Sequence, residues 1–172
     1  DQYIFQAYPN GYQRIFFTVE DRIQFDGENT SSANAFDLKT NRLFRDTSGW
    51  YNIVVKWDVT QAVAADRVKL YINGVQETSF AVETYPAQNN TYPLNSASAP
   101  TFIGRHNTDT ATYFNGLMSY YYFIDGTAYD ASTFGEVDSD TGEWKILTSP
   151  TVTMGTNGFT ILKNGDTITD QS

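Results

Sequence analysis

The sequence predicts an all-β fold, an antiparallel two-sheet β-sandwich of the jelly-roll type. In residues 51–57 and 68–72, apolar residues recur at every second position and many are β-branched or aromatic. This pattern is typical of half-buried antiparallel strands. Asn73-Gly74 follows directly and fits a type I′ turn, which needs two residues that tolerate positive φ. Many further short strand patterns are separated by turn residues, and this arrangement favours a sandwich.

The bulk properties exclude several classes of protein. The 172 residues predict one domain, which we place at residues 1–162, followed by a polar tail or edge at 163–172. A net charge of −9 argues against binding nucleic acid or an anionic membrane through a basic patch. The absence of cysteine excludes disulfides, thiolate zinc sites and cysteine nucleophiles. No apolar run is long enough to insert into a bilayer.

The remaining elements are assigned from local patterns, mainly alternation for strands and Gly, Pro, Asn and Ser for loops. We expect further strands at residues 3–7, 14–19, 22–25, 36–38, 43–44, 101–104, 113–124, 144–146 and 152–162. Polar loops are expected at 26–35, 83–100 and 136–143, and single helical turns at 61–66 and 131–134. The predicted core comprises Ile53, Val55, Trp57, Leu70 and Ile72.

Several fragments, taken in order, carry a family resemblance. They are SGWYNIV at 48–54, VKLYING at 68–74, FIG at 102–104, YFNGL at 113–117 and FIDG at 123–126. Together they resemble the concanavalin A-like lectin/glucanase superfamily, in its laminin-G-like and pentraxin-like branch. The later fragments FGE at 134–136, DSDTGEWK at 138–145 and GTNGF at 155–159 resemble a subgroup common in tail and virion proteins of marine bacteriophages.

The resemblance implies a concanavalin A-like jelly roll with a non-catalytic binding or structural role on a virion surface. Family members usually begin with an additional strand pair, whereas this sequence opens directly in a strand pattern. We therefore expect a sheet edge near residues 3–7 to be covered by protein from outside the segment. This expectation makes a homo-oligomer, or a place in a larger assembly, part of the prediction.

The sequence gives little support for catalysis. Glycosidases of this superfamily carry Glu-x-Asp-x-x-Glu on one strand, which places two carboxylates on one face. The nearest stretch, Glu136 to Thr141, lacks the last acid and is loop-like. The single histidine, His106, lies in a polar loop with no evident catalytic partner. We predict that the chain is not an enzyme and needs no cofactor, with a glycosidase as the weakest alternative.

An acidic loop permits two interpretations. Carboxylates at alternate positions beside a glycine can bind Ca²⁺. The candidate ligands are Asp138, Asp140 and Glu143, close to Gly142. The spacing is not that of an EF-hand, and the alternative is a turn whose Asp side chains accept hydrogen bonds from local backbone N–H groups. We expect the turn and keep Ca²⁺ as the alternative.

Aromatic and polar residues in the two longest polar loops are candidate glycan contacts. Aromatic faces pack against sugar C–H groups, and Asn and Asp bind hydroxyls. The candidate residues are Tyr85, Tyr92, His106, Asn107, Asp109 and Tyr113. The alternative is that the tyrosines pack over the sandwich rim. The sequence thus predicts a glycan- or receptor-binding module of a tail fibre, and alternatively a capsid or tail decoration protein that binds other virion proteins.

Overall fold

The structure is a computed structural model that describes residues 1–8, 11–29, 35–94, 100–107, 112–165 and 168–172. Nearly all of the regular structure in these ranges is β, and the strands pair antiparallel, which confirms the predicted fold class. The chain divides into two compact units. The first comprises residues 1–49, 58–68 and 77–115, and the second comprises 50–57, 69–76 and 116–172.

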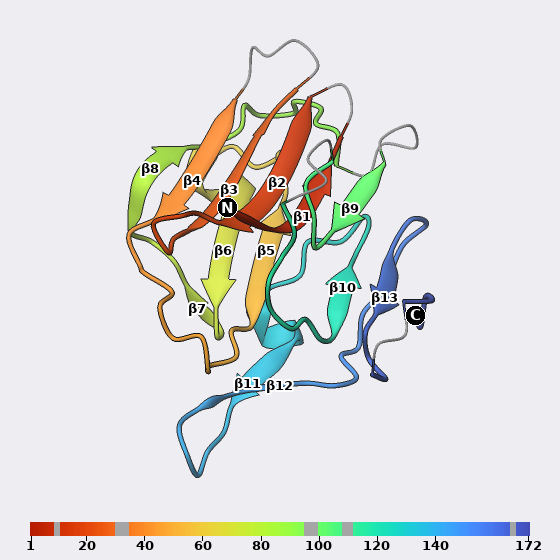
Figure 1. The fold of residues 1–172 in the computed structure, drawn as a ribbon. Helices are drawn as coiled ribbons and strands as arrows, with labels where there is room; N and C mark the ends of the chain where they lie inside the picture. The colour runs from red at the N-terminus through yellow and green to blue at the C-terminus, as the bar shows by residue number, and fades with distance from the viewer. Residues whose placement is uncertain (9–10, 30–34, 95–99, 108–111, 166–167) are drawn as a thin grey trace. The chain divides into compact units, whose positions relative to one another are not determined.

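The first unit contains a six-stranded antiparallel sheet, in the order β8-β4-β3-β2-β1-β9 (Figure 1). Its strands are β1 (Gln2–Ala7), β2 (Tyr12–Phe17), β3 (Ile23–Glu28), β4 (Phe36–Thr40), β8 (Phe80–Thr84) and β9 (Thr101–Ile103). Strands β2 and β3 pair as a hairpin and confirm the two strands predicted at 14–19 and 22–25. A short helix, α1 (Ala64–Arg67), overlaps the helical turn expected at 61–66.

The two faces of this sheet differ in polarity. Directly opposed residues on neighbouring strands share a face. One such row is apolar and consists of Ile103, Phe5, Ile15, Phe25 and Leu38. Its members on β1 to β4 are buried. This row therefore belongs to the core, and the alternating residues on the opposite face form the polar row described below.

Two expectations for this sheet are wrong. Strand β1 is not an edge, because it pairs with β2 on one side and with β9 on the other, so the edge predicted at residues 3–7 does not exist. Strand β3 also extends to Glu28, into the stretch predicted as a loop from residue 26. The sequence obscured this extension because Asp26 faces the polar side of the sheet, where alternation with apolar residues gives no signal.

The second unit contains a three-stranded sheet, β5-β6-β7. Its strands are β5 (Ile53–Trp57), β6 (Val68–Ile72) and β7 (Val75–Gln76). The turn between β6 and β7 is as predicted, since Asn73 and Gly74 have φ values of 48° and 76°. Leu70 and Ile72 are each 1% exposed, which confirms that part of the predicted core. All five residues of β5 are only partly buried, so the alternation expected there is absent.

The rest of the second unit forms short strand pairs. The 3-10 helix η1 (Ala131–Thr133) confirms a predicted helical turn, and β11 (Gly135–Val137) pairs with β12 (Trp144–Ile146). The long strands predicted at 113–124 and 152–162 are much shorter, as β10 (Tyr121–Phe123) and β13 (Phe159–Ile161). Tyr120 explains the first difference, because its φ of 50° is incompatible with extended backbone.

The polar segment after residue 162 returns to strand β13. Gln171 N donates to the carbonyl of Thr160 at 2.8 Å, and the Asp170 carboxylate accepts from Thr160 N at 3.1 Å. Lys163 N also donates to the Gln171 side chain at 2.9 Å. The described part of this segment therefore folds against the second unit. Among the described residues, none of the helices has the length and apolar character that crossing a membrane requires.

Candidate functional site

The structure separates the candidate glycan contacts that the sequence grouped together. Tyr85 follows β8, at one edge of the six-stranded sheet, whereas His106, Asn107 and Tyr113 follow β9, at the opposite edge. Tyr85 donates its hydroxyl to Glu83 at 3.0 Å, and burial with this hydrogen bond raises the pKa of Tyr85 to about 12. Its hydroxyl is therefore bound to a residue of the same edge strand, β8. Asp109 lies outside the described residues.

Tyr92 is a core residue. Its exposed fraction is 7%, and its ring meets that of Phe36 edge to face with centroids 5.4 Å apart. Phe36 in turn contacts Phe25, a member of the apolar row, with centroids 4.9 Å apart. A ring enclosed in this way has no surface to offer a sugar, so the prediction of Tyr92 as a ligand contact is wrong.

The loop after β9 returns to the polar face of the sheet. The His106 ring lies 4.8 Å from the ring of Tyr3, and Asn107 N donates to the Gln6 side chain at 3.0 Å. Arg105 pairs with Tyr113 in an isolated bridge, and Tyr113 is 54% exposed. Two of the predicted contacts, His106 and Asn107, are thus placed against strand β1.

A row of polar side chains crosses this face. Gln6, Arg14, Asp26 and Asp37 are directly opposed on β1, β2, β3 and β4. Gln6 is 2% and Asp26 is 6% exposed, while Arg14 and Asp37 are partly exposed. Burying polar and charged groups costs stability unless they are paired. A continuous polar row at the centre of a sheet is therefore an unusual feature, and we call it the polar row.

Arg14 and Asp26 form the centre of the polar row. Arg14 Nε and Nη2 donate to the two carboxylate oxygens of Asp26 at 2.8 and 2.6 Å, a bidentate pair. The guanidinium carbon lies 4.3 Å from the ring centre of Tyr12 and 5.3 Å from that of Phe16. Burial alone would lower the pKa of Arg14, but the hydrogen bond and charge of Asp26 outweigh it and raise the pKa. The charge of Arg14 is therefore permanent and its position is fixed.

Asp37 is a second carboxylate beside Asp26. Its oxygen accepts a hydrogen bond from Gln24 Nε2 at 2.9 Å. Burial and the neighbouring charge of Asp26 raise the pKa of Asp37. The same two causes raise the pKa of the Tyr12 hydroxyl. This part of the face thus presents rigid hydrogen-bonding groups, while Arg14 covers the aromatic ring of Tyr12.

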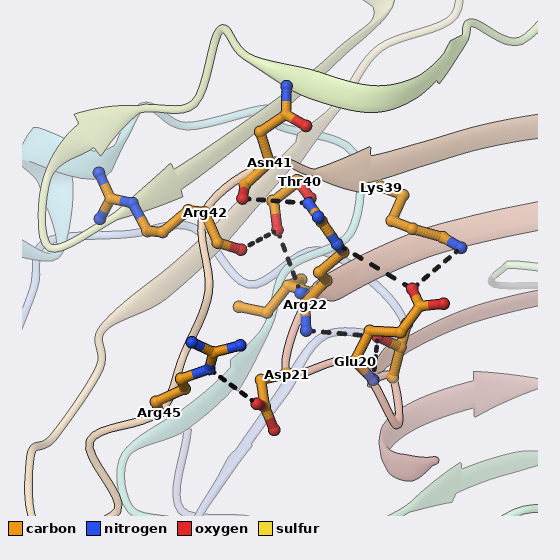
Figure 2. Close-up of polar contacts among 10 residues, drawn as sticks. Glu20, Asp21, Arg22, Lys39, Thr40, Asn41, Arg42 and Arg45 are labelled. Atoms are coloured by element: carbon orange, nitrogen blue, oxygen red, sulfur yellow. Dashed lines mark hydrogen bonds and ion pairs between the residues drawn. The ribbon is translucent and has the colours of Figure 1, made fainter.

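A hollow of about 510 Å³ lies at the β4–β8 side of the same unit. It is lined by Val19, Glu20, Asp21, Arg22, Lys39, Leu43, Arg45, Ala81 and Val82. Figure 2 shows the charged members of this lining, Glu20, Asp21, Arg22, Lys39 and Arg45. Lys39 shares the polar face of the sheet, since it lies directly opposite Gln24 on β3 and Val82 on β8. The hollow therefore adjoins the polar row. The sequence alone did not predict this hollow.

The acidic loop is a capped turn. The Asp138 carboxylate accepts hydrogen bonds from the backbone N–H groups of Asp140 and Thr141 at 2.9 and 3.0 Å. These backbone bonds lower the pKa of Asp138. Glu143 closes the turn through its carbonyl, which accepts from Asp138 N at 2.8 Å. Among the described residues, no three acidic or histidine side chains gather as a metal site would require.

The sequence reading missed the polar row for an identifiable reason. Its members come from four strands, so only the pairing register brings them together. The one signal available was that Arg14 and Asp26 are opposite charges at the start of one predicted strand and directly after the next. Opposite charges placed one per strand in a predicted hairpin indicate a cross-strand pair once the register is known.

These features define a class before any comparison: an antiparallel β fold of lectin-like type, with an apolar row on one face of its six-stranded sheet and a polar row on the other. Residues 1–131 match the model of a family described as the concanavalin A-like lectin/glucanases superfamily, in a laminin G form. The chain belongs to this superfamily. The matched region contains the whole six-stranded sheet and ends where η1 begins. No curated protein and no solved structure gave a significant match.

Proposed function

We propose that the chain is a non-catalytic module that binds a cell-surface glycan or glycosylated receptor through the polar face of its six-stranded sheet. The family supports a lectin-like binding role in general terms. The observation that carries the specific proposal is the polar row, because paired charges and amides at the centre of a sheet are retained at a cost in stability. Such fixed groups can bind sugar hydroxyls without reorganising.

The chemistry of the face favours hydrogen bonding over aromatic packing. Arg14 lies over Tyr12, and Arg105 lies 5.0 Å from the ring centre of Phe102, so each ring already has a cation at one face. Gln24 and Asp37 are partly exposed and can donate to and accept from hydroxyl groups. His106 and Asn107 bring the loop after β9 to the same face.

We further propose that the module belongs to a bacteriophage virion and acts at its surface, in a tail fibre. The support is the likeness of the FGE and TGEW fragments to virion proteins. In the structure these fragments build the β11–β12 hairpin, with Trp144 against the backbone of Gly135. This hairpin follows the region that the superfamily model matches.

A glycan array carrying neutral, uronate and sulfated members tests the binding role. Gln24→Ala and Asp37→Ala should each lower affinity for the array's best ligand by roughly tenfold, because each loses a hydrogen bond or charge contact. Lys145→Ala is the control, because Lys145 is exposed on the separate β11–β12 hairpin, and it should bind as the wild type does. An empty array, or a loss of binding caused by Lys145→Ala alone, would contradict the proposal.

A role in assembly is a second candidate because of strand β8. Residues Ala81 to Thr84 are exposed, and within the described chain β8 pairs with β4 alone. An exposed strand edge can pair with another protein chain. Light scattering of the purified chain tests this candidate: a mass above 19.4 kDa supports it, and a monomer across the accessible concentration range counts against it.

A further inference from the structure

The hollow beside the polar row concentrates positive charge. Three of the chain's eleven cationic residues, Arg22, Lys39 and Arg45, line it together with two anionic ones, Glu20 and Asp21. Its lining therefore carries a net charge of +1 in a chain whose net charge is −9. A positive region on an otherwise acidic chain attracts anions locally.

The cations of the hollow hold their internal anion loosely. The carboxylate of Glu20 lies 3.7 Å from Lys39 Nζ and 4.0 Å from Arg22 Nε, beyond hydrogen-bonding distance, and it is 60% exposed (Figure 2). Arg45 is 70% exposed, and among the described residues it donates only its Nε, to Asp21 at 3.1 Å. Within this part of the chain, Lys39 Nζ and the two Nη groups of Arg45 therefore retain N–H groups that an external anion can accept from.

The Arg22 side chain of the hollow is held in place by hydrogen bonds to the backbone. Its Nη1 donates to the carbonyls of Thr40 and Asn41 at 2.7 and 3.0 Å. The side chain is consequently tied to the end of β4, where Lys39 also lies. A β-bulge in the pairing of β4 with β8 allows two consecutive residues, Ala81 and Val82, to line the hollow. The site is thus built on two strands and a tight turn.

The hollow continues the polar row across the sheet. Lys39 is directly opposite Gln24, and Gln24 donates to Asp37 in the polar row. A ligand lying across the strands from Arg14 towards β8 would reach Lys39 after about two strand spacings, roughly 10 Å. This distance lies within the span of a short oligosaccharide, so a single oligosaccharide can contact both the polar row and the hollow.

We propose that the hollow binds the sulfate or carboxylate group of an acidic saccharide whose neighbouring sugars lie on the polar face. This inference rests on the proposed function, and it specifies the ligand as anionic. The group replaces the loosely held Glu20 carboxylate between Lys39 and Arg22, and Arg45 donates to it from the rim. Arginine and lysine are the usual partners of sulfate and carboxylate groups in proteins.

The test compares charge changes of both signs. Binding of the full chain to dextran sulfate, polygalacturonate and neutral dextran is measured by calorimetry at two salt concentrations. Lys39→Gln and Arg45→Gln should each weaken binding to one acidic polymer by about tenfold, and Glu20→Gln should strengthen it several-fold because the competing internal anion is removed. The sulfate and carboxylate polymers identify which anion the hollow accepts.

Matched controls come from the β11–β12 hairpin, where Glu136 and Lys145 are directly opposed and exposed. Lys145→Gln and Glu136→Gln make the same changes in net charge and should leave affinity within about twofold. The inference would be overturned if Lys145→Gln weakened binding as much as Lys39→Gln does, or if Glu20→Gln weakened binding. It would also be overturned if the wild-type chain bound neither acidic polymer.

The two proposals fail in distinguishable ways. If the acidic polymers bind independently of Lys39 but the array ligand still requires Gln24 and Asp37, only the anionic specificity is lost. If dextran sulfate binding depends on Lys39 while the array is empty, the hollow is an anion site and glycan binding on the polar face is wrong. Circular dichroism of each variant confirms that it is folded.

Discussion

The substitution Tyr92→Ala should destabilise the protein strongly, although the sequence suggested that this residue meets a ligand. An aromatic side chain buries about 150–250 Å², which at roughly 25 cal/mol per Å² gives about 4–6 kcal/mol as an upper bound. Tyr92 is only 7% exposed, so nearly all of this applies. We expect a loss of about 3–5 kcal/mol in the free energy of unfolding, the range for large aromatic truncations.

Part of that loss belongs to one ring pair. The edge-to-face contact of Tyr92 with Phe36, at 5.4 Å, should contribute about 0.5–1.5 kcal/mol beyond area burial. A double-mutant cycle with Tyr92→Leu and Phe36→Leu measures this coupling by urea denaturation. Tyr113→Ala is the matched control because Tyr113 is 54% exposed, and it should change stability by no more than about 0.5 kcal/mol.

The result that would refute the core assignment is specific. If Tyr92→Ala cost less than about 1 kcal/mol, or no more than Tyr113→Ala, the ring could not be enclosed as described. A thermal scan gives an independent check, since a chain of this size should lose about 2–4 °C of Tm for each kcal/mol. Binding to a glycan should be unchanged wherever the variant remains folded.

Three further predictions follow from other sites. Gly74→Val should destabilise the β6–β7 hairpin by more than about 2 kcal/mol in urea denaturation, because φ is 76° and a Cβ atom would lie 2.1 Å from the Trp144 ring. The control Gly142→Ala should cost less, because φ there is 74° but the space around the residue is open. Asp37→Asn should raise the free energy of unfolding at pH 7, because the raised pKa of Asp37 means that its charged form destabilises the folded state. The gain should shrink as the pH falls through this raised pKa towards the unfolded value near 3.9, since the folded wild type then takes up the proton. A gain that grows on acidification would contradict this. Calcium should leave the Tm unchanged, and a rise that Asp140→Ala abolishes would restore the metal interpretation of the acidic loop.

The sequence was sufficient where local patterns decide the structure. Alternation identified β1 and β6, and Asn73-Gly74 identified a tight turn, because positive φ at two successive positions is a local requirement. Alternation was insufficient where both faces of a strand carry other demands. Strand β5 is partly buried at every position, so its burial does not alternate. Strand β3 continues through Asp26, which belongs to the polar row and therefore does not follow an apolar pattern.

The candidate site was less predictable because it is a property of register. Loop composition selected His106 and Asn107, which lie against strand β1, but it also selected Tyr92, whose neighbours are core rings. Aromatic residues in a polar loop look the same in sequence whether they turn inwards or outwards. The polar row and the hollow unite residues from separate strands, which a single sequence does not align.

The binding site is tested most directly by a two-dimensional NMR titration of the labelled chain with an acidic oligosaccharide selected from the array. We predict that the largest shift changes fall on amides of the polar face and the hollow, centred on Gln24, Asp37 and Lys39 and extending to Asn107. Shift changes confined to the hairpin loop at residues 138–143 would contradict the assignment of the polar face as the binding site.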